Sequence, residues 1–246
     1  MKGSFSSPRR VLGYHIDKNL FPDNTYGNSS GGYPDKIPDL TYEQFKNFHK
    51  TYYHPTNSYL YLYGNSDLDQ DLAFINEEYL SKFDKLDKRA KITPQKPYDK
   101  MKDVVEYYPV GKTDDTKDKT FLAMDWVIGD GADQEMGFLM SIIAQALVNH
   151  ESGPVKLALQ EAGIGRDVYA YFSRNKQGVF QINVNNANLE DKDKFYNIVT
   201  ETLVKVSEEG IDKEVLNGII NRYEFNLREG DNSQKGLTYL FQAKNG

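Results

Sequence analysis

The side chains best suited to metal chemistry in this sequence are four histidines, His15, His49, His54 and His150. A zincin-type site needs two histidines one helical turn apart, with a glutamate between them as the base. None of the four has another histidine four residues away. His49 and His54 are five residues apart, and the second stands before a proline, where a helix ends. The spacing therefore predicts histidines on the surface or at helix ends, and no zinc site within the chain.

Residues 27–31, Gly-Asn-Ser-Ser-Gly, match the G-x-S-x-G pattern of a serine nucleophile. That pattern works only between a strand and a helix, because the sharp turn between them exposes the serine. Here Pro-Asp-Asn-Thr precedes the pattern and Gly-Tyr-Pro follows it. These residues instead predict a flexible polar loop in which glycine allows unusual backbone angles, so a serine hydrolase is disfavoured.

Composition excludes several functional classes. The chain has 246 residues, a net charge of −6 and no cysteine, which rules out disulfides and cysteine–zinc sites and disfavours the basic face of a nucleic-acid binder. No apolar run approaches the roughly 20 residues that cross a membrane, and the N-terminus lacks the apolar segment of a signal peptide. We expect a soluble chain with no nucleic-acid and no membrane partner. The compartment stays unknown, with the bacterial cytoplasm and an organelle matrix favoured.

The elements around the serine-containing loop are clearly marked. Residues 20–40 include three prolines and a Gly-Gly pair, which predict a long non-helical loop. Thr41 and Gln44 can form the capping box of a helix, and Pro55 ends that helix. Tyrosine and leucine then alternate over residues 58–63, which is the period of a half-buried strand. The predicted order is loop, helix, strand.

This run resembles the pitrilysin (insulinase) family of zinc metallopeptidases, and most of all its presequence-protease and falcilysin branch. The likeness rests on Asn-Thr-Tyr-Gly at 24–27, Ser-Gly-Gly-Tyr-Pro at 30–34 and Tyr-Tyr-His-Pro-Thr-Asn at 52–57. The inverted H-x-x-E-H zinc motif of the family is absent. In the family, the third zinc ligand is the glutamate of an Asn-Glu-Met-Lys-Gly run, and this sequence opens on Met-Lys-Gly. The resemblance implies that the chain is a piece of a longer protein, with that glutamate just before residue 1. The alternative is a native start at Met1, in which case the Met-Lys-Gly match is coincidental.

Further along, residue spacing predicts alternating strands and helices. The segment 84–103 has seven basic residues, four acidic residues and two prolines, with little to bury, which predicts a linker. The fold class is α+β, with helices packed on antiparallel sheets. Helices are expected over 9–20, 68–83, 133–149, 154–163, 188–210, 212–223 and from 237, and strands over 104–110, 120–128, 168–173 and 179–186.

The order of these elements resembles the opening of the second domain of the pitrilysin family. The resemblance therefore implies parts of two consecutive pitrilysin-like domains. Residues 1–83 would be the C-terminal half of the first, catalytic-type peptidase domain. Residues 84–103 would be the linker, and residues 104–246 the N-terminal part of a second, non-catalytic peptidase-like domain.

The resemblance also implies a function for the longer protein, which we call the parent. It would be a zinc-dependent metalloendopeptidase that degrades short unstructured peptides in an enclosed chamber, with its zinc bound outside this piece. This piece would supply chamber wall and domain interface; its partners would be peptide substrates and the remaining domains of the same chain. The substrate-cleft candidates are Tyr26, Ser30, Gly31 and Gly32. The alternative is a non-catalytic, peptidase-like binding or assembly module, since some relatives lost the zinc motif.

The histidine spacing and the lack of cysteine give a direct test. Protein of this sequence, purified without a histidine tag, should contain no stoichiometric, tightly bound zinc, because high affinity needs ligands that the chain does not have. Elemental analysis after dialysis measures the metal content. One zinc per chain would contradict the prediction.

Overall fold

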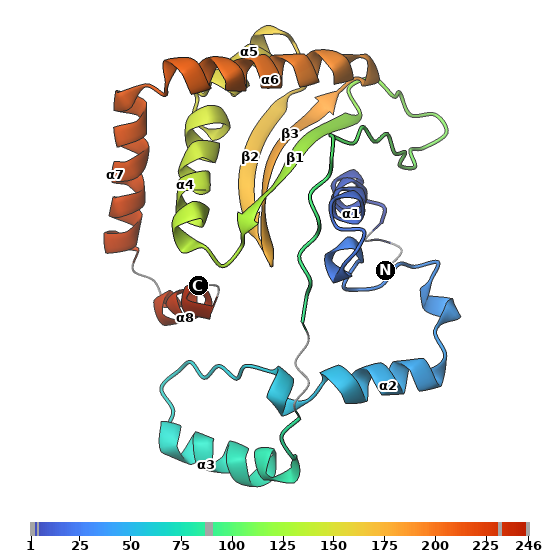
Figure 1. The fold of residues 1–246 in the computed structure, drawn as a ribbon, viewed down its shortest axis with the longest axis vertical. Helices are drawn as coiled ribbons and strands as arrows, with labels where there is room; N and C mark the ends of the chain where they lie inside the picture. The colour runs from blue at the N-terminus through green and yellow to red at the C-terminus, as the bar shows by residue number, and fades with distance from the viewer. Residues whose placement is uncertain (1–2, 4, 87–90, 231–232, 245–246) are drawn as a thin grey trace.

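A three-stranded antiparallel sheet lies in the upper half of the structure as drawn in Figure 1. The structure is a computed structural model that describes residues 3, 5–86, 91–230 and 233–244. The side chains of residues 242 and 244 are also outside the description. The strand order is β1-β3-β2, so the last strand in sequence is the central one. The strands are β1 (Thr120–Asp130), β2 (Asp167–Arg174) and β3 (Gln177–Ala187).

One face of the sheet is apolar because every second residue of each strand is apolar. The antiparallel register aligns Trp126 of β1 with Phe180 of β3 and Phe172 of β2. Ile182 and Val184 continue this row on the central strand, and both are fully buried. The predicted strands over 120–128, 168–173 and 179–186 are confirmed, as is the hairpin between the last two.

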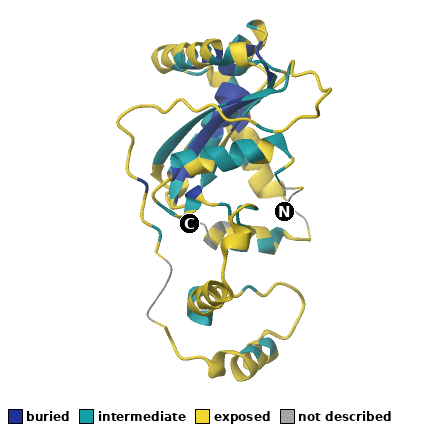
Figure 2. Cartoon of the chain, turned by 90° about the vertical axis from the view of Figure 1, so that its right-hand side faces the viewer, coloured by how far each residue is buried: buried dark blue, intermediate teal, exposed yellow. Residues whose placement is uncertain are grey.

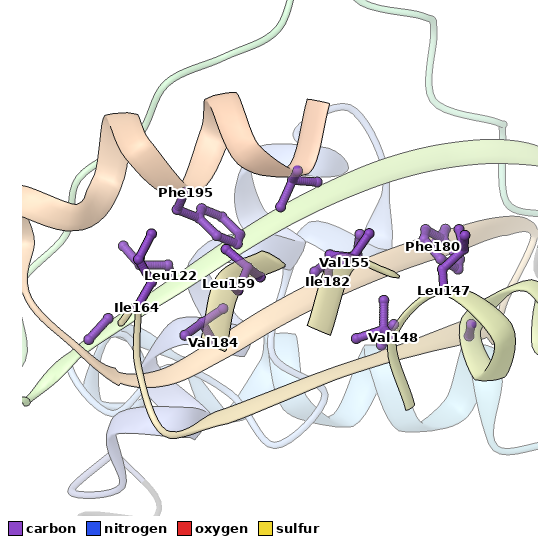
Figure 3. Packing of buried hydrophobic residues seen from close by; sticks show 14 residues of the cluster. Leu122, Leu147, Val148, Val155, Leu159, Ile164, Phe180, Ile182, Val184 and Phe195 are labelled. Carbon is purple, nitrogen blue, oxygen red and sulfur yellow. The ribbon is translucent and has the colours of Figure 1, made fainter. Parts of the chain in front are cut away.

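Helices cover this apolar face and form the core with it (Figure 3). Pro154 begins α5 at the first-turn position where proline is favoured. Helix α4 continues into a π-helical turn, and α5 packs on both that turn and α6. The covering elements are α4 (Gln134–Ala144), the turn Gln145–Asn149, α5 (Pro154–Glu161) and α6 (Lys192–Glu209). The core side chains are Leu122, Ala144, Leu147, Val148, Val155, Leu159, Ile164, Ala170, Phe180, Ile182, Val184, Ala187, Phe195 and Val199.

A second, smaller cluster joins the next helix to this layer. Ile219 of α7 (Lys213–Glu229) packs against Ile142 and Ala146. Asp212 caps α7 as predicted, with its Oδ1 accepting from the backbone N–H groups of residues 214 and 215. A last helix, α8, spans Lys235–Lys244. None of the helices in the described ranges is long and apolar enough to cross a lipid bilayer.

Only part of the N-terminal third of the chain contacts the sheet. Helix α1 (Pro8–Leu20) contacts β1 from the side opposite α5 and α6, and in Figure 3 it lies behind the sheet. Helices α2 (Tyr42–Tyr52) and α3 (Leu68–Glu78) project away from the sheet, and their residues are almost all exposed (Figures 1 and 2). Four 3₁₀ turns connect these segments: Thr25–Gly27, Ile37–Asp39, Pro55–Asn57 and Leu80–Lys82.

Local signals in the N-terminal third predicted its helices well. Thr41 and Gln44 form the predicted capping box, with the Gln44 N–H donating to Thr41 Oγ1 at 3.2 Å and the Thr41 N–H donating to Gln44 Oε1 at 2.9 Å. Asp67 caps α3, which ends slightly before the predicted boundary. The α+β class is therefore confirmed, with a single sheet among the described residues.

Two predicted strands are wrong. Residues 58–63 and 104–110 lie in no sheet. In the first segment the alternating side chains stay exposed, Tyr59 at 71% and Leu60 at 61%. A strand needs a neighbour for its backbone hydrogen bonds, and no strand of the described chain pairs with either segment. The predictions that involve Met1, Lys2 and residues 87–90 lie outside the described residues.

The contrast between the packed sheet and the exposed α2 makes a prediction about stability. Leu159→Ala should lower the free energy of unfolding by about 2–5 kcal/mol, because it opens a cavity at a fully buried position. Phe45→Ala, a matched truncation at a residue that is 63% exposed, should change it by less than about 0.5 kcal/mol. Urea unfolding followed by circular dichroism measures both. An equal loss in the two variants would contradict this account of the core.

Candidate functional site

Tyr26 is the one predicted cleft residue that joins distant parts of the chain. It lies in the first 3₁₀ turn, where its N–H donates to Asn24 Oδ1 at 3.0 Å. Its ring meets Phe21 edge-on, with the ring centroids 5.7 Å apart. Its hydroxyl accepts from the backbone N–H of Lys176 at 3.1 Å. Tyr26 thus fastens the N-terminal loop to the β2–β3 turn, which is a structural role.

The turn that holds Tyr26 depends on its neighbour Gly27. A Cβ at residue 27 would lie 2.3 Å from the carbonyl oxygen of Phe21, far inside contact distance. Gly27 is itself buried. The glycine in the predicted loop is therefore required by close backbone packing, and not by a nucleophile beside it.

The other predicted cleft residues form a separate, exposed turn. Ser30 and Gly31 are exposed, and the Gly32 N–H donates to the Ser29 carbonyl at 2.9 Å. Gly32 has a φ of +82°, a conformation that glycine adopts without strain. A 3₁₀ turn precedes the G-x-S-x-G pattern and a loop follows it, so the strand–serine–helix arrangement of a nucleophile is not formed.

The four histidines are spread over the structure and have local structural partners. Among the residues that the structure describes, no three His, Cys, Asp or Glu side chains come together in a group that could hold a metal ion. The residues that the structure describes therefore do not fit a zinc site. The histidine partners are Glu106 Oε1 at 3.2 Å from His15 Nδ1, the Tyr53 ring stacked on His49, the Thr56 N–H at 3.2 Å from His54 Nδ1, and Ser152 Oγ at 2.7 Å from His150 Nδ1.

A buried glutamine in the predicted linker completes the joint that Tyr26 begins. Gln95 is 5% exposed. Its Oε1 accepts from the Asp23 N–H at 3.0 Å, and its Nε2 donates to Asp23 Oδ2 at 2.6 Å. Its own N–H donates to Gln177 Oε1 at 2.6 Å, and its carbonyl accepts from Gln177 Nε2 at 3.2 Å. We call Tyr26, Asp23, Gln95, Lys176 and Gln177 the joint.

Sequence reasoning missed Gln95 because its partners lie 72 and 82 residues away. Within the predicted linker, Gln95 is the one buried residue among those that the structure describes. One signal was present: Pro94 and Pro97 flank Gln95 and restrict the backbone to extended conformations, which helps to present the glutamine on both sides. The joint connects residues of the predicted first domain to residues of the predicted second domain.

A cluster of acidic and phenolic groups lies where α1 meets the sheet. Burial, with a contribution from the charge of Asp17, raises the pKa of Asp125 in β1 to about 7. Partial burial also raises the pKa of Asp17. Burial and the nearby charge of Asp125 raise the pKa of Tyr171 in β2 to about 12. No positive charge of the described residues offsets these shifts, and burial favours the neutral form of both carboxyl groups.

Two shallow hollows lie away from the predicted cleft residues. One of about 350 Å³ is lined by Tyr108, Lys119, Phe121 and Asn186, among others. The other, of about 370 Å³, is lined by Val105, Tyr107, Leu189 and Lys192 with their neighbours. Neither contains Tyr26 or residues 30–32. The joint can hold segments of the chain in position. Neither the joint nor the cluster of Asp17, Asp125 and Tyr171 contains a nucleophile in contact with a base.

Comparison with models of protein families identifies the family of the chain. The family model described as the peptidase M16 inactive domain matches residues 39–223. The chain belongs to the peptidase M16 family. This M16 chain is 43% identical over 246 residues to Protein HypA of Clostridium perfringens, and 31% identical over 242 residues to the mitochondrial presequence protease of Xenopus laevis. The alignments cover 99% and 97% of this chain.

The M16 chain spans about a quarter of the length of these relatives, 25% and 24% respectively. Solved structures share its fold. The peptidase M16 inactive domain from Pseudomonas fluorescens matches with a TM-score of 0.67 and 18% identity, over 99% of this chain and 57% of that one. Pitrilysin matches with a TM-score of 0.52 and 17% identity, over 88% of this chain and 24% of that one. The predicted resemblance to the pitrilysin family, as a fragment lacking the zinc motif, is confirmed.

The raised pKa of Asp125 predicts a pH dependence of stability. A carboxyl group whose folded pKa of about 7 lies above its unfolded value of about 3.9 stabilises the fold below pH 4, and that contribution is lost as the pH rises to 7. Asp125→Asn, which cannot ionise, should remove this loss and raise the free energy of unfolding at pH 8 relative to wild type. The upper limit is about 4 kcal/mol, at about 1.4 kcal/mol per pKa unit.

The measurement is urea unfolding at pH 5 and pH 8 for wild type and Asp125→Asn. Asp35→Asn, a matched change at an exposed loop residue, controls for the loss of one carboxylate. The decisive quantity is the change with pH that Asp125→Asn abolishes and Asp35→Asn leaves in place. If both variants keep the wild-type pH profile, Asp125 is not the titrating group.

Proposed function

We propose that this chain is part of a zinc-dependent M16 metalloendopeptidase that degrades short unstructured peptides in an enclosed chamber. The observation that carries the proposal is the likeness over almost the whole chain to presequence proteases, 31% identity over 97% of its length. In this proposal the chain supplies chamber wall and domain interface. The zinc, and the water it would activate, belong to parts of the parent beyond these residues.

The joint supports the domain-interface role. Tyr26 and Asp23 come from the predicted first domain, residues 1–83, whereas Lys176 and Gln177 come from the predicted second domain, residues 104–246. Gln95, from the linker, bonds to both sides. A fully hydrogen-bonded, buried polar group specifies one arrangement of the segments that it joins. The joint would therefore hold the two domains in a fixed relation, as a chamber wall requires.

The exposed aromatic side chains of α2 support the proposal that residues 1–83 are only part of a domain. Tyr42, Phe45 and Phe48 of α2 are 72%, 63% and 59% exposed. A patch of large apolar side chains on this scale normally marks a contact with another surface. Tyr59 and Leu60, in the segment 58–63 that pairs with no strand, are also exposed. We infer that preceding residues of the parent cover this face and give residues 58–63 a strand partner.

The alternative is a non-catalytic binding or assembly module built on the same scaffold. The described residues hold no group that could bind a metal, which is compatible with both possibilities. The sequence of the parent before residue 1 separates the two possibilities, because an intact H-x-x-E-H motif indicates an enzyme and its loss indicates a scaffold protein. Under either proposal the piece contributes binding surface and no catalytic group.

Peptide cleavage by three proteins of increasing length tests the proposal. The 246-residue chain should not cleave a quenched fluorescent peptide, with or without added zinc. A protein extended upstream through the missing part of the first domain should bind zinc, and the full parent should cleave the peptide and lose that activity to a chelator. The full parent should also spare folded proteins, because an enclosed chamber admits only flexible chains.

Two outcomes would overturn the proposal. Chelator-insensitive cleavage by the 246-residue chain would point to chemistry within it, and Ser29→Ala would then be the first variant to measure. A full parent that binds no zinc and cleaves no peptide would favour the scaffold alternative. The presequence proteases among the relatives offer a positive control for the assay.

A further inference from the structure

The central strand presents a row of buried amides on the face opposite the core. Gln181, Asn183 and Asn185 alternate with Phe180, Ile182 and Val184, so the two sets point to opposite faces. The three amide residues are only 5%, 3% and 1% exposed. We call them the amide row. One face of β3 is therefore polar and yet as buried as the apolar core.

The neighbouring strands extend this polar surface. The register places Asp125 of β1 and Tyr171 of β2 on either side of Gln181, and Tyr169 beside Asn183. Asp167 pairs with Asn185 at the start of β2. Each amide of the row thus has a polar or aromatic neighbour across the sheet.

The buried polar atoms of this face have no hydrogen-bond partners among the described residues. They are Gln181 Oε1, Asn183 Nδ2, both side-chain polar atoms of Asn185, and Asp125 Oδ1. Buried polar groups in folded proteins are normally paired, and an unpaired group carries its full desolvation cost. Five such atoms on one face make this arrangement unfavourable compared with one in which water reaches the row.

Helix α1 lies over this face; it is held at its two ends and, in its middle, by the contact of His15 Nδ1 with Glu106 Oε1 at 3.2 Å. At its start, Arg9 lies 3.9 Å from Asp167 and 5.8 Å over the Tyr169 ring, and so reaches the Asn185 and Asn183 levels of the row. Asp17 lies close enough to act electrostatically on Asp125 and Tyr171, at the Gln181 level. Beyond its end, Tyr26 bonds to Lys176. Within the described part of the chain, α1 gives none of the five unpaired atoms a hydrogen-bond partner.

The two ends of α1 are therefore held by interactions of unequal strength. The ion pair of Arg9 with Asp167 is exposed on both partners, at 62% and 63%, and exposed pairs contribute little. At the other end, Gln95 of the joint is buried and bonds to both Asp23 and Gln177. Between the two, the carboxyl groups of Asp17 and Asp125 repel one another when ionised.

We propose that α1 is a detachable strap, hinged at the joint and released at Arg9, that lifts from the amide row and lets water or a polar partner reach it. The lifted state hydrates the five unpaired atoms while the core between β3 and α5 stays closed. The proposal concerns this chain alone and does not depend on the peptidase activity proposed for the parent.

The absence of cysteine allows a clean accessibility test. Asn183→Cys places a single thiol on the amide row, and Ile182→Cys places one on the apolar face of the same strand at a residue that is equally buried. Each variant is mixed with 5,5′-dithiobis(2-nitrobenzoic acid) in native buffer, and its global unfolding is measured in urea. The thiol of Asn183→Cys should react at least about tenfold faster than global unfolding of that variant allows. The thiol of Ile182→Cys should react only at the global rate of its own variant.

Release at Arg9 gives the second arm. Adding Arg9→Ala to each thiol variant should speed labelling of Asn183→Cys several-fold and leave labelling of Ile182→Cys unchanged. Lys18→Ala is the matched control, because Lys18 is a cation of α1 whose contact is the Tyr14 ring of the same helix. The strap does not exist if the thiol on the amide row reacts no faster than global unfolding permits, or if Lys18→Ala accelerates its labelling as much as Arg9→Ala.

Hydrogen exchange of the unsubstituted protein keeps the proposal falsifiable if Asn183→Cys does not fold. The backbone amides of α1 should exchange well before those of α5, since α1 opens without unfolding of the core. Exchange of α1 and α5 at one common rate would mean that α1 leaves the sheet only on global unfolding, which would overturn the proposal.

Discussion

The central strand β3 determines the arrangement of the whole structure, because its two faces impose opposite requirements. Its apolar residues, Phe180, Ile182 and Val184, are buried beneath α4, α5 and α6 and form the middle of the core. Its polar residues, Gln181, Asn183 and Asn185, are equally buried but carry atoms left unpaired within the described chain. The first face gives stability through burial of apolar area. The second face lies under α1, which gives its unpaired polar atoms no hydrogen-bond partner.

The joint links this two-faced sheet to the N-terminal third. Gln95 reaches Asp23 on one side and Gln177 on the other, and Tyr26 bonds to the adjacent Lys176. These bonds fix how the loop after α1 meets the β2–β3 turn, and they tie the two predicted domains together. For an M16 chain that spans a quarter of its relatives, we therefore interpret the piece as a domain junction with some of the surface on either side.

What could be predicted from sequence was mostly local. The capping box of Thr41 and Gln44 and the cap at Asp212 depend on residues within one helical turn, so the sequence alone indicates them. The strands of the sheet were predictable from alternation. Residues 58–63 alternate equally well and yet form no strand, because pairing depends on a neighbour that no local pattern can supply.

The functional predictions divide in the same way. The family followed from an ordered set of residues between 24 and 57, and the comparisons confirm it. Among the predicted cleft residues, Tyr26 proved important for the joint, whereas residues 30–32 form an exposed turn. The joint itself was hidden because hydrogen bonds across 72 and 82 residues leave no periodic signal. Only the folded chain brings Asp23, Gln95 and Gln177 together.

We interpret this chain as a domain junction in which the rest of the parent gives residues 58–63 a strand partner. Hydrogen exchange of the backbone amides of residues 59–63 tests it most directly, compared between the 246-residue chain and the full parent. The account predicts fast exchange in the piece, where these residues are unpaired, and strong protection in the parent, where they gain a strand partner. Equally fast exchange in both proteins would contradict it.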